Sequence, residues 1–228
     1  MLLLNKGILN FSGVNYLSIL QDGHTAGWYA YDEASTITKS TGNTVSRWND
    51  LLGSGHDLIQ ATAGYQPVWS ANGILFDGIN DFMKAVAFTL NQPEFIYMVV
   101  KPISFSTYST WFDGAVNNSG NVLFGTTTPN IYATAPTGSA NNSNASLGNW
   151  HIIRVLFNGA SSKLIVDATT PTTWNCGANN MSGFTLAKIG TAALYYGHIQ
   201  TKEIIIRSSA DSAGDEAAIY NYLKTKLV

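Results

Sequence analysis

The sequence is poor in cysteine and in charge, two features that often indicate function. Its single cysteine, Cys176, cannot form an internal disulfide and has no neighbouring histidine at metal-ligand spacing. Charged residues make up 11% of the 228 residues, with 12 Lys and Arg against 14 Asp and Glu. Because no basic run is present to neutralise phosphates, we expect no nucleic-acid binding.

Long apolar runs are also missing. The first twenty residues are apolar, but Asn5, Lys6 and Gly7 interrupt them after three leucines, which is not the pattern of a secretory signal. No stretch reaches 18 consecutive apolar residues, so we expect no membrane insertion.

Catalytic motifs are the third absence. Retaining glycosidases need two carboxyl groups about 5 Å apart, which adjacent positions on one strand face supply. Glu33, Glu94 and Glu203 have no carboxylate two positions away. The four histidines are scattered, and neither a G-x-S-x-G motif nor a phosphate-binding glycine loop occurs. The sequence therefore predicts that the protein is not an enzyme.

The pattern from residue 25 onward is that of an all-β protein. Short alternating apolar runs are separated by clusters of Gly, Asn, Ser and Thr. Residues 151–157 and 163–167 flank an Asn-Gly turn and predict a hairpin. Further strands are expected at 74–76, 82–88, 95–101, 110–112, 121–124, 185–189 and 202–207. The run 95–100 is apolar on both faces and predicts a covered strand in the middle of a sheet.

Two segments after residue 25 depart from this pattern, and the N-terminal segment precedes it. Residues 212–227 carry Ile219, Leu223 and Leu227 at helical spacing, with acidic residues first and lysines last, and predict an amphipathic C-terminal helix. Residues 138–149 read as a polar loop. The apolar segment 1–24 is expected to be either an edge strand or a docking arm, and residues 25–228 form one domain.

Seven motifs follow one another along the chain: GWYAYD at 27–32, VSRWND at 45–50, GSGHD at 53–57, QATAGYQP at 60–67, ILFDGIND at 74–81, LIVD at 164–167 and KEIIIR at 202–207. In this order they resemble the laminin-G-like domains of the concanavalin A-like lectin/glucanase superfamily. In LIVD, Ala168 follows where the family usually has glycine. The resemblance implies a jelly-roll sandwich of two antiparallel sheets closed by a short C-terminal α-helix. Trp48, Asn49 and Asp50 are interpreted as structural residues.

Aromatic residues in turn-rich segments are the carbohydrate-binding candidates, because tyrosine and tryptophan stack on sugar rings and tolerate partial exposure. The chosen aromatic residues are Trp174, Tyr195, Tyr196 and Trp111, with Tyr65, Trp69 and Tyr108 as further candidates. Asp113 is chosen with them as a hydrogen-bonding partner for sugar hydroxyls, a role that Asn117 and Asn118 could share. The alternative is that these aromatics close the ends of the sandwich or contact a neighbouring subunit. Asp77 and Asp81 are candidate calcium ligands, since some laminin-G-like domains bind calcium, although no dense carboxylate cluster is present. No other cofactor is indicated.

The resemblance and the low-charge surface together favour a structural or adhesion component of a bacteriophage virion, in a tail fibre, tail tip or capsid decoration. Its expected partners are other virion proteins, further copies of itself as a homo-oligomer, and a host-surface glycan. The alternative is a free bacterial lectin that is extracellular or at the cell surface, and a polysaccharide-active enzyme is the third interpretation.

Overall fold

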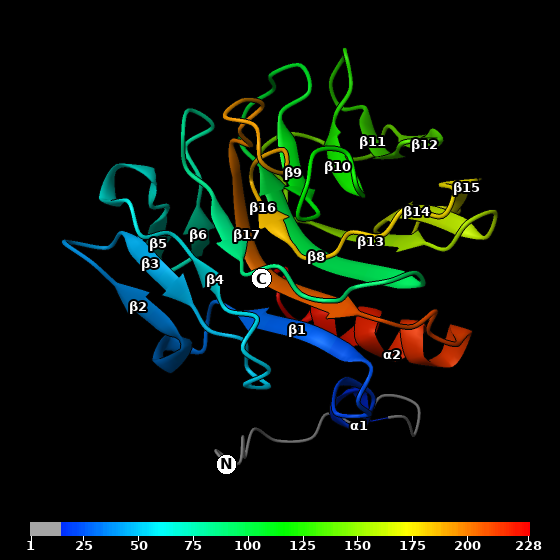
Figure 1. Ribbon diagram of the computed structural model, residues 1–228, viewed down its shortest axis with the longest axis horizontal. Coiled ribbons are helices and arrows are strands. Elements are labelled where there is room, and N and C mark those ends of the chain that lie inside the picture. The colour runs from blue at the N-terminus through cyan, green and yellow to red at the C-terminus, as the bar shows by residue number, and fades with distance from the viewer. Residues whose placement is uncertain (1–14) are drawn as a thin grey trace.

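The chain forms a sandwich of two antiparallel β-sheets, which confirms the predicted fold (Figure 1). The computed structural model describes residues 15–228. Sheet A has the strand order β15 (Thr172–Trp174), β14 (Ser162–Val166), β13 (His151–Phe157), β8 (Glu94–Pro102), β17 (Ile199–Arg207), β6 (Gly73–Leu75) and β5 (Val68–Ser70), and β1 (Thr25–Ala30) also pairs with β17. Sheet B has the order β12 (Gly138–Asn142), β11 (Ile131–Ala135), β10 (Asn121–Phe124), β9 (Thr110–Asp113), β16 (Thr185–Leu186), β7 (Met83–Ala85), β4 (Leu58–Ile59), β3 (Val45–Trp48) and β2 (Ile37–Lys39).

The main core lies between the sheets and follows from the two-residue period of the strands. In β11, Ile131, Ala133 and Ala135 are buried in this core, whereas Tyr132 and Thr134 face the other way. Trp48 is fully buried beside Tyr29 and donates to the carbonyl oxygen of Ala30, in line with its interpretation as a structural residue. The outer face of sheet B is therefore left with polar and aromatic side chains.

A second core covers the outer face of sheet A. The helices α1 (Tyr16–Leu20) and α2 (Ala213–Lys224) lie on the β8 and β17 side of the molecule, away from sheet B (Figure 1). Ile219 and Leu223 of α2 pack there with Phe95, Tyr97 and Val99 of β8. This explains why the 95–100 run is apolar on both faces. Short 3-10 turns lie at Ala34–Thr36 and Ala63–Tyr65.

We expect Leu223→Ala to lower the free energy of unfolding by about 2–3 kcal/mol, the low end of the range for buried Leu→Ala changes. Leu223 is fully buried, but α2 lies on an outer face where the helix can settle into part of the cavity. Urea unfolding followed by circular dichroism measures the effect, with the exposed Leu194→Ala as control. An unchanged midpoint would show that α2 does not pack as described.

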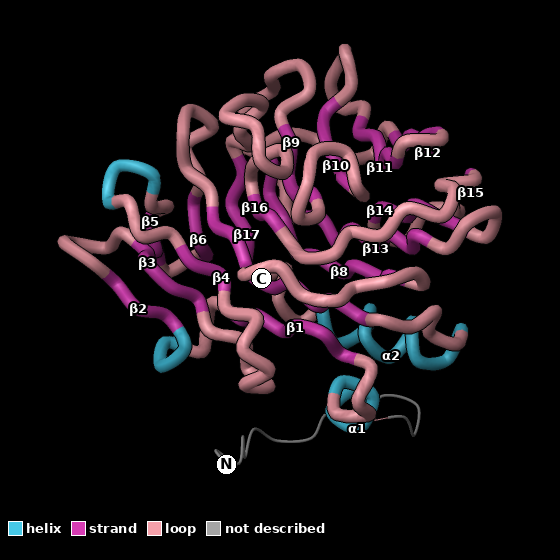
Figure 2. The backbone as a smooth tube through the Cα atoms, in the orientation of Figure 1, coloured by secondary structure: helices cyan, strands magenta, loops and turns pink. Residues whose placement is uncertain are grey.

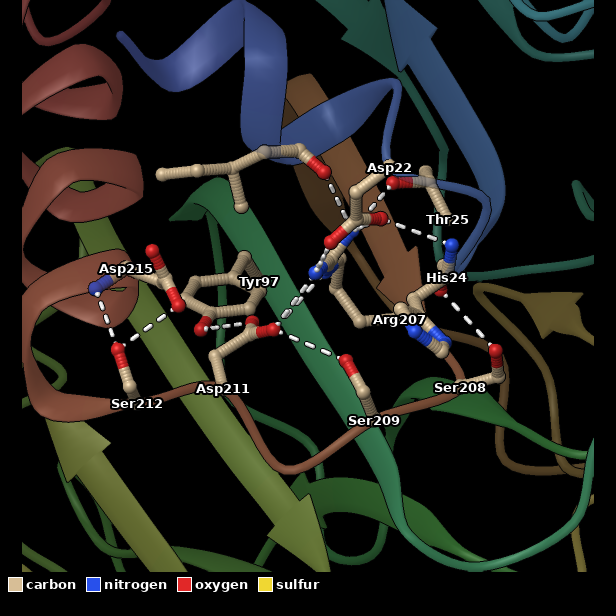
Figure 3. Close-up of polar contacts among 11 residues, drawn as sticks. Asp22, His24, Thr25, Tyr97, Arg207, Ser208, Ser209, Asp211, Ser212 and Asp215 are labelled. Atoms are coloured by element: carbon tan, nitrogen blue, oxygen red, sulfur yellow. Dashed lines mark hydrogen bonds and ion pairs between the residues drawn. The ribbon is translucent and has the colours of Figure 1, made fainter. Parts of the chain in front are cut away.

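A buried ion cluster fixes the segment after α1 to sheet A (Figure 3). The guanidinium of Arg207, at the end of β17, donates to both carboxylate oxygens of Asp22, at 2.8 Å each, and to Asp211 at 2.8 and 3.0 Å. It also donates to the carbonyl oxygen of Ile19, and Tyr97 donates to the second oxygen of Asp211. The hydrogen bond from Arg207 keeps the pKa of Asp22 below its usual value.

Two sequence expectations need correction or restriction. The region 138–149 is not entirely loop, because Gly138–Asn142 forms β12, whose Ala140 and Asn142 alternate inward at the edge of sheet B. Of the segment 1–24, Tyr16–Leu20 is a helix rather than a strand, and residues 1–14 lie outside the described residues. Within 15–228, no helix has the length and apolar character needed to cross a membrane.

Candidate functional site

A cavity of about 420 Å³ opens on the outer face of sheet B. Its floor is made by Leu123 of β10 with Tyr132 and Thr134 of β11. Its walls come from connections next to β9, β10 and β16, which gather at one end of the molecule (Figure 2). The complete lining is Tyr108, Asn118, Leu123, Gly125, Thr126, Tyr132, Thr134, Ile189 and Tyr195.

Two half-exposed tyrosines form an aromatic wall. The rings of Tyr108 and Tyr195 meet edge to face with their centroids 5.7 Å apart. Both residues have a left-handed backbone, with φ of 63° and 59°, as does Asn118 with φ of 58°. Six non-glycine residues in 15–228 have positive φ, and three of them line this cavity. A strained backbone conformation persists only where the surrounding structure imposes it, and such positions are concentrated at functional sites.

A chain of hydrogen bonds sets the polar side of the cavity. The Thr134 hydroxyl donates to Oδ1 of Asn121, and the Asn121 amide donates to Oδ1 of Asn118 at 3.0 Å. Asn118 therefore presents its own amide N–H groups to a ligand, and Thr134 presents its hydroxyl lone pairs. One donor and one acceptor are thus available on the floor and wall of the cavity.

The carboxylate of Asp113 fixes the two loops that carry Asn118 and Ile189. It accepts backbone N–H groups from Gly114, Asn118, Ser119, Gly120 and Gly190 at 2.7 to 3.4 Å. Asn117 adds bonds from the backbone N–H groups of Thr191 and Ala192. Burial raises the pKa of Asp113 to about 6, although these N–H donors act in the opposite direction. Asp113 is a positioning residue, because its side chain is enclosed by the loops that it organises.

Gly125 allows the ring of Tyr132 to lie against the backbone of the cavity floor. A β-carbon at position 125 would come within 2.2 Å of the Tyr132 ring. Any larger residue would therefore displace this ring, since real β-carbons do not approach so closely.

The structure brings some of the sequence candidates together and separates others. Tyr195 lines the cavity with Tyr108 and Asn118, and Asp113, which is not part of the lining, accepts the backbone N–H of Asn118. Trp111 is fully buried in the main core against Phe124, so its ring offers no surface to a ligand. The lining does not include Trp174 or Tyr196: Trp174 lies on edge strand β15 of sheet A against Phe157, and the Tyr196 ring lies near Phe82, 6.4 Å from it. A single stacking surface of Trp174, Tyr195 and Tyr196 does not form.

The calcium candidates belong to a tight turn. Oδ1 of Asp77 accepts the backbone N–H groups of Ile79, Asn80 and Asp81, and Asp81 accepts that of Asp77. Burial, followed by the charge of Asp77, raises the pKa of Asp81 to about 6. Across 15–228, no group of three or more His, Cys, Asp or Glu side chains is arranged to hold a metal ion.

Sequence reasoning did not select Leu123, Tyr132 or Thr134. The alternation of Ile131–Ala135 against Asn121–Phe124 contains the signal, because their register pairs Leu123 with Tyr132 and Asn121 with Thr134 on one outward face. This signal can be recognised only when the neighbouring strand and the register of each strand are known.

Comparison with known proteins identifies the fold. No protein-family model and no curated protein sequence matches this chain. Among solved structures, a Trypanosoma rangeli sialidase in complex with sialic acid is similar, with a TM-score of 0.66, 9% identity, and coverage of 89% of this chain and 33% of the sialidase. A GH54 α-L-arabinofuranosidase matches with a TM-score of 0.61 and 12% identity, over 81% of this chain and 51% of that one.

The binding domain of Paraclostridial Mosquitocidal Protein 1 is a third similar structure. Its TM-score is 0.60 at 12% identity, over 89% of this chain and 53% of that one. This chain thus spans about a third of the sialidase chains and about half of the other two.

These likenesses correct one expectation. The prediction that the protein is not an enzyme is contradicted, because sialidases and an arabinofuranosidase are among the proteins with this architecture. The laminin-G-like relationship, the virion role and the homo-oligomer stay predictions. What the comparisons show is the fold, a two-sheet antiparallel β-sandwich that this chain shares with parts of a sialidase and an arabinofuranosidase and with the binding domain of a mosquitocidal protein.

Proposed function

We propose that the protein binds a saccharide in the cavity on the outer face of sheet B. The observation that carries this proposal is the meeting of two strained, half-exposed tyrosines with a fixed amide donor and hydroxyl acceptor in one cavity. Ligand sites combine apolar and aromatic walls with a few convergent polar groups in this way.

The chemistry of a sugar ring matches both parts of the lining. The C–H face of the ring packs against Tyr108 or Tyr195, whose rings are large and have a polar tip. Ring hydroxyls accept from the Asn118 amide and donate to the Thr134 hydroxyl. Because Asp113 holds the loops before ligand arrives, little ordering is needed on binding.

The similar solved structures support this proposal through their fold and their own ligands. One T. rangeli sialidase structure is a complex with sialic acid, and the mosquitocidal protein fragment is a binding domain. We extend saccharide binding on this fold to the cavity of this chain.

We expect Tyr195→Ala to weaken saccharide binding at least tenfold and to leave stability nearly unchanged, because the side chain is 44% exposed. A glycan array identifies the ligand, and isothermal titration calorimetry measures its affinity. Leu194→Ala is the matched control, since Leu194 is the adjacent residue, is 43% exposed and lies outside the lining.

Two results would count against the proposal: full affinity in the Tyr195→Ala variant, or no hit on a broad array with folded protein. Chromatography of the same saccharides after incubation reports any hydrolysis independently of binding.

A further inference from the structure

A second cluster lies on the outer face of sheet B and contacts the 114–120 loop, which also lines the cavity. Met83 and Ala85 of β7 point into the main core, so the intervening Lys84 faces outward. Its ammonium donates to the carbonyl oxygen of Ala115, in the same loop whose Asn118 lines the cavity. Lys84 pairs across the sheet with Thr185, three residues before Lys188.

Lys188 is a buried cation with an unusual environment. The residue as a whole is 7% exposed, and its ammonium lies 4.0 Å from the centre of the Phe82 ring. In the described part of the chain, no carboxylate lies within ion-pair distance of either Lys84 or Lys188, and no hydrogen-bond acceptor is found for the Lys188 ammonium.

Other largely buried cations among the described residues have oxygen partners for their charge. Arg154 pairs with Glu216, Arg207 with Asp22 and Asp211, and Lys202 donates to the carbonyl oxygens of Lys226 and Val228. Buried charges are expected to be paired, because desolvation is costly. Burial, followed by the charge of Lys84, lowers the pKa of Lys188. An oxyanion between the two ammonium groups would remove this imbalance.

Aromatic rings surround the same position. The Phe82 ring is 6.1 Å from Tyr65 and 6.4 Å from Tyr196. Tyr195 and Tyr196 therefore place adjacent rings in two different clusters, one in the cavity and one beside the lysines. Rings next to a cationic group suit a sugar that carries an acidic substituent.

We propose that Lys84 and Lys188 form a subsite for the carboxylate or sulfate group of an acidic saccharide, which packs over Phe82, Tyr65 and Tyr196. This inference rests on the proposed saccharide binding and extends it to the charge of the ligand. The two ammonium groups supply the point charges for the oxyanion, and the rings supply the apolar surface.

The test compares oligogalacturonate, the same oligosaccharide after carboxyl reduction, and a sulfated heparin oligosaccharide. Calorimetry measures their binding to wild type, Lys188→Met, the Lys84→Gln/Lys188→Met double variant, and Lys224→Gln as a control on α2, which packs on sheet A. We expect wild type to prefer at least one acidic ligand, whose carboxylate or sulfate then identifies the oxyanion. The double variant should bind that ligand at least tenfold more weakly, and Lys224→Gln should bind it normally.

Thermal unfolding separates a ligand-binding role from a structural one. Lys188→Met should melt at the wild-type temperature or higher, because an unpaired cation on a largely buried residue is replaced by an apolar side chain of similar length. A lower melting temperature, or undiminished binding of the acidic ligand by the double variant, would overturn the proposal. Equal affinity for the acidic and the carboxyl-reduced oligosaccharide would overturn it as well.

If no saccharide binds, the proposed function fails, and inorganic sulfate then tests the lysine subsite alone. At equal ionic strength, sodium sulfate should raise the melting temperature relative to sodium chloride more in wild type than in the double variant. Equal gains in both proteins would reject the subsite.

Discussion

Arg207→Met is expected to lower the free energy of unfolding by about 3–5 kcal/mol, the cost of breaking a buried ion pair by removing one partner. The Arg207 side chain is 2% exposed, and that of its partner Asp211 is 1% exposed. The substitution leaves the Asp211 carboxylate buried, and among residues 15–228 only the hydroxyl groups of Tyr97 and Ser209 then donate to it. It also releases Asp22 and the end of α1.

Urea unfolding at neutral pH measures this loss. Arg47→Met is the matched control, because Arg47 forms an ion pair with Asp57 at 2.9 Å but its side chain is 47% exposed. Exposed pairs contribute about 0–1 kcal/mol. Equal losses in the two variants would show that the Arg207 cluster has no special role in stability.

Glu94→Gln is expected to change how stability depends on pH. Glu94 is fully buried at the start of β8, where it accepts the Met181 backbone N–H through one oxygen and has no partner for the other within the described structure. Burial raises the pKa of Glu94 from 4.5 to about 8. Below pH 4.5 the group is neutral in both the folded and unfolded states, so it has no effect on their balance.

As the pH rises from about 4.5 to about 8, the unfolded chain loses its Glu94 proton and the folded chain keeps it. The wild-type protein therefore loses about 3–5 kcal/mol of stability over this range through Glu94 alone. Glutamine keeps the shape and the acceptor for Met181 but does not titrate. The difference between the two unfolding free energies should thus grow with pH, and parallel curves would contradict this assignment.

Sequence patterns predicted the sandwich because each strand carries its own alternation. Asn121–Phe124 and His151–Phe157 begin and end as expected. The helix predicted over 212–227 forms over Ala213–Lys224 with Ser212 as its N-cap and ends before Leu227. These features depend on neighbours that are close in sequence. Because the interactions that favour these strands and this helix are local, a single sequence is enough to predict them.

The candidate site was only partly predictable because it depends on contacts between distant segments. Tyr108 and Tyr195 are 87 residues apart, and their meeting depends on the left-handed backbone at both positions. The burial of Trp111 was equally hidden, since the polar residues around it suggest exposure while the fold places its ring in the core. The cover on sheet A by α1 and α2 was also not evident, because nothing in a strand sequence shows which element will pack on it.

The position of β17 in the chain has a consequence for biosynthesis. Ile199–Arg207 is the central strand that joins β8 to β6 and β1, although it is the last strand of the chain, and α2 follows it. A nascent chain that has not reached residue 199 exposes the unpaired edge of β8 and its apolar Phe95–Val100 face. Such edges invite pairing between chains. Folding of sheet A must therefore wait until Ile199–Arg207 has been synthesised, and translation stalled before β17 yields a product prone to aggregation.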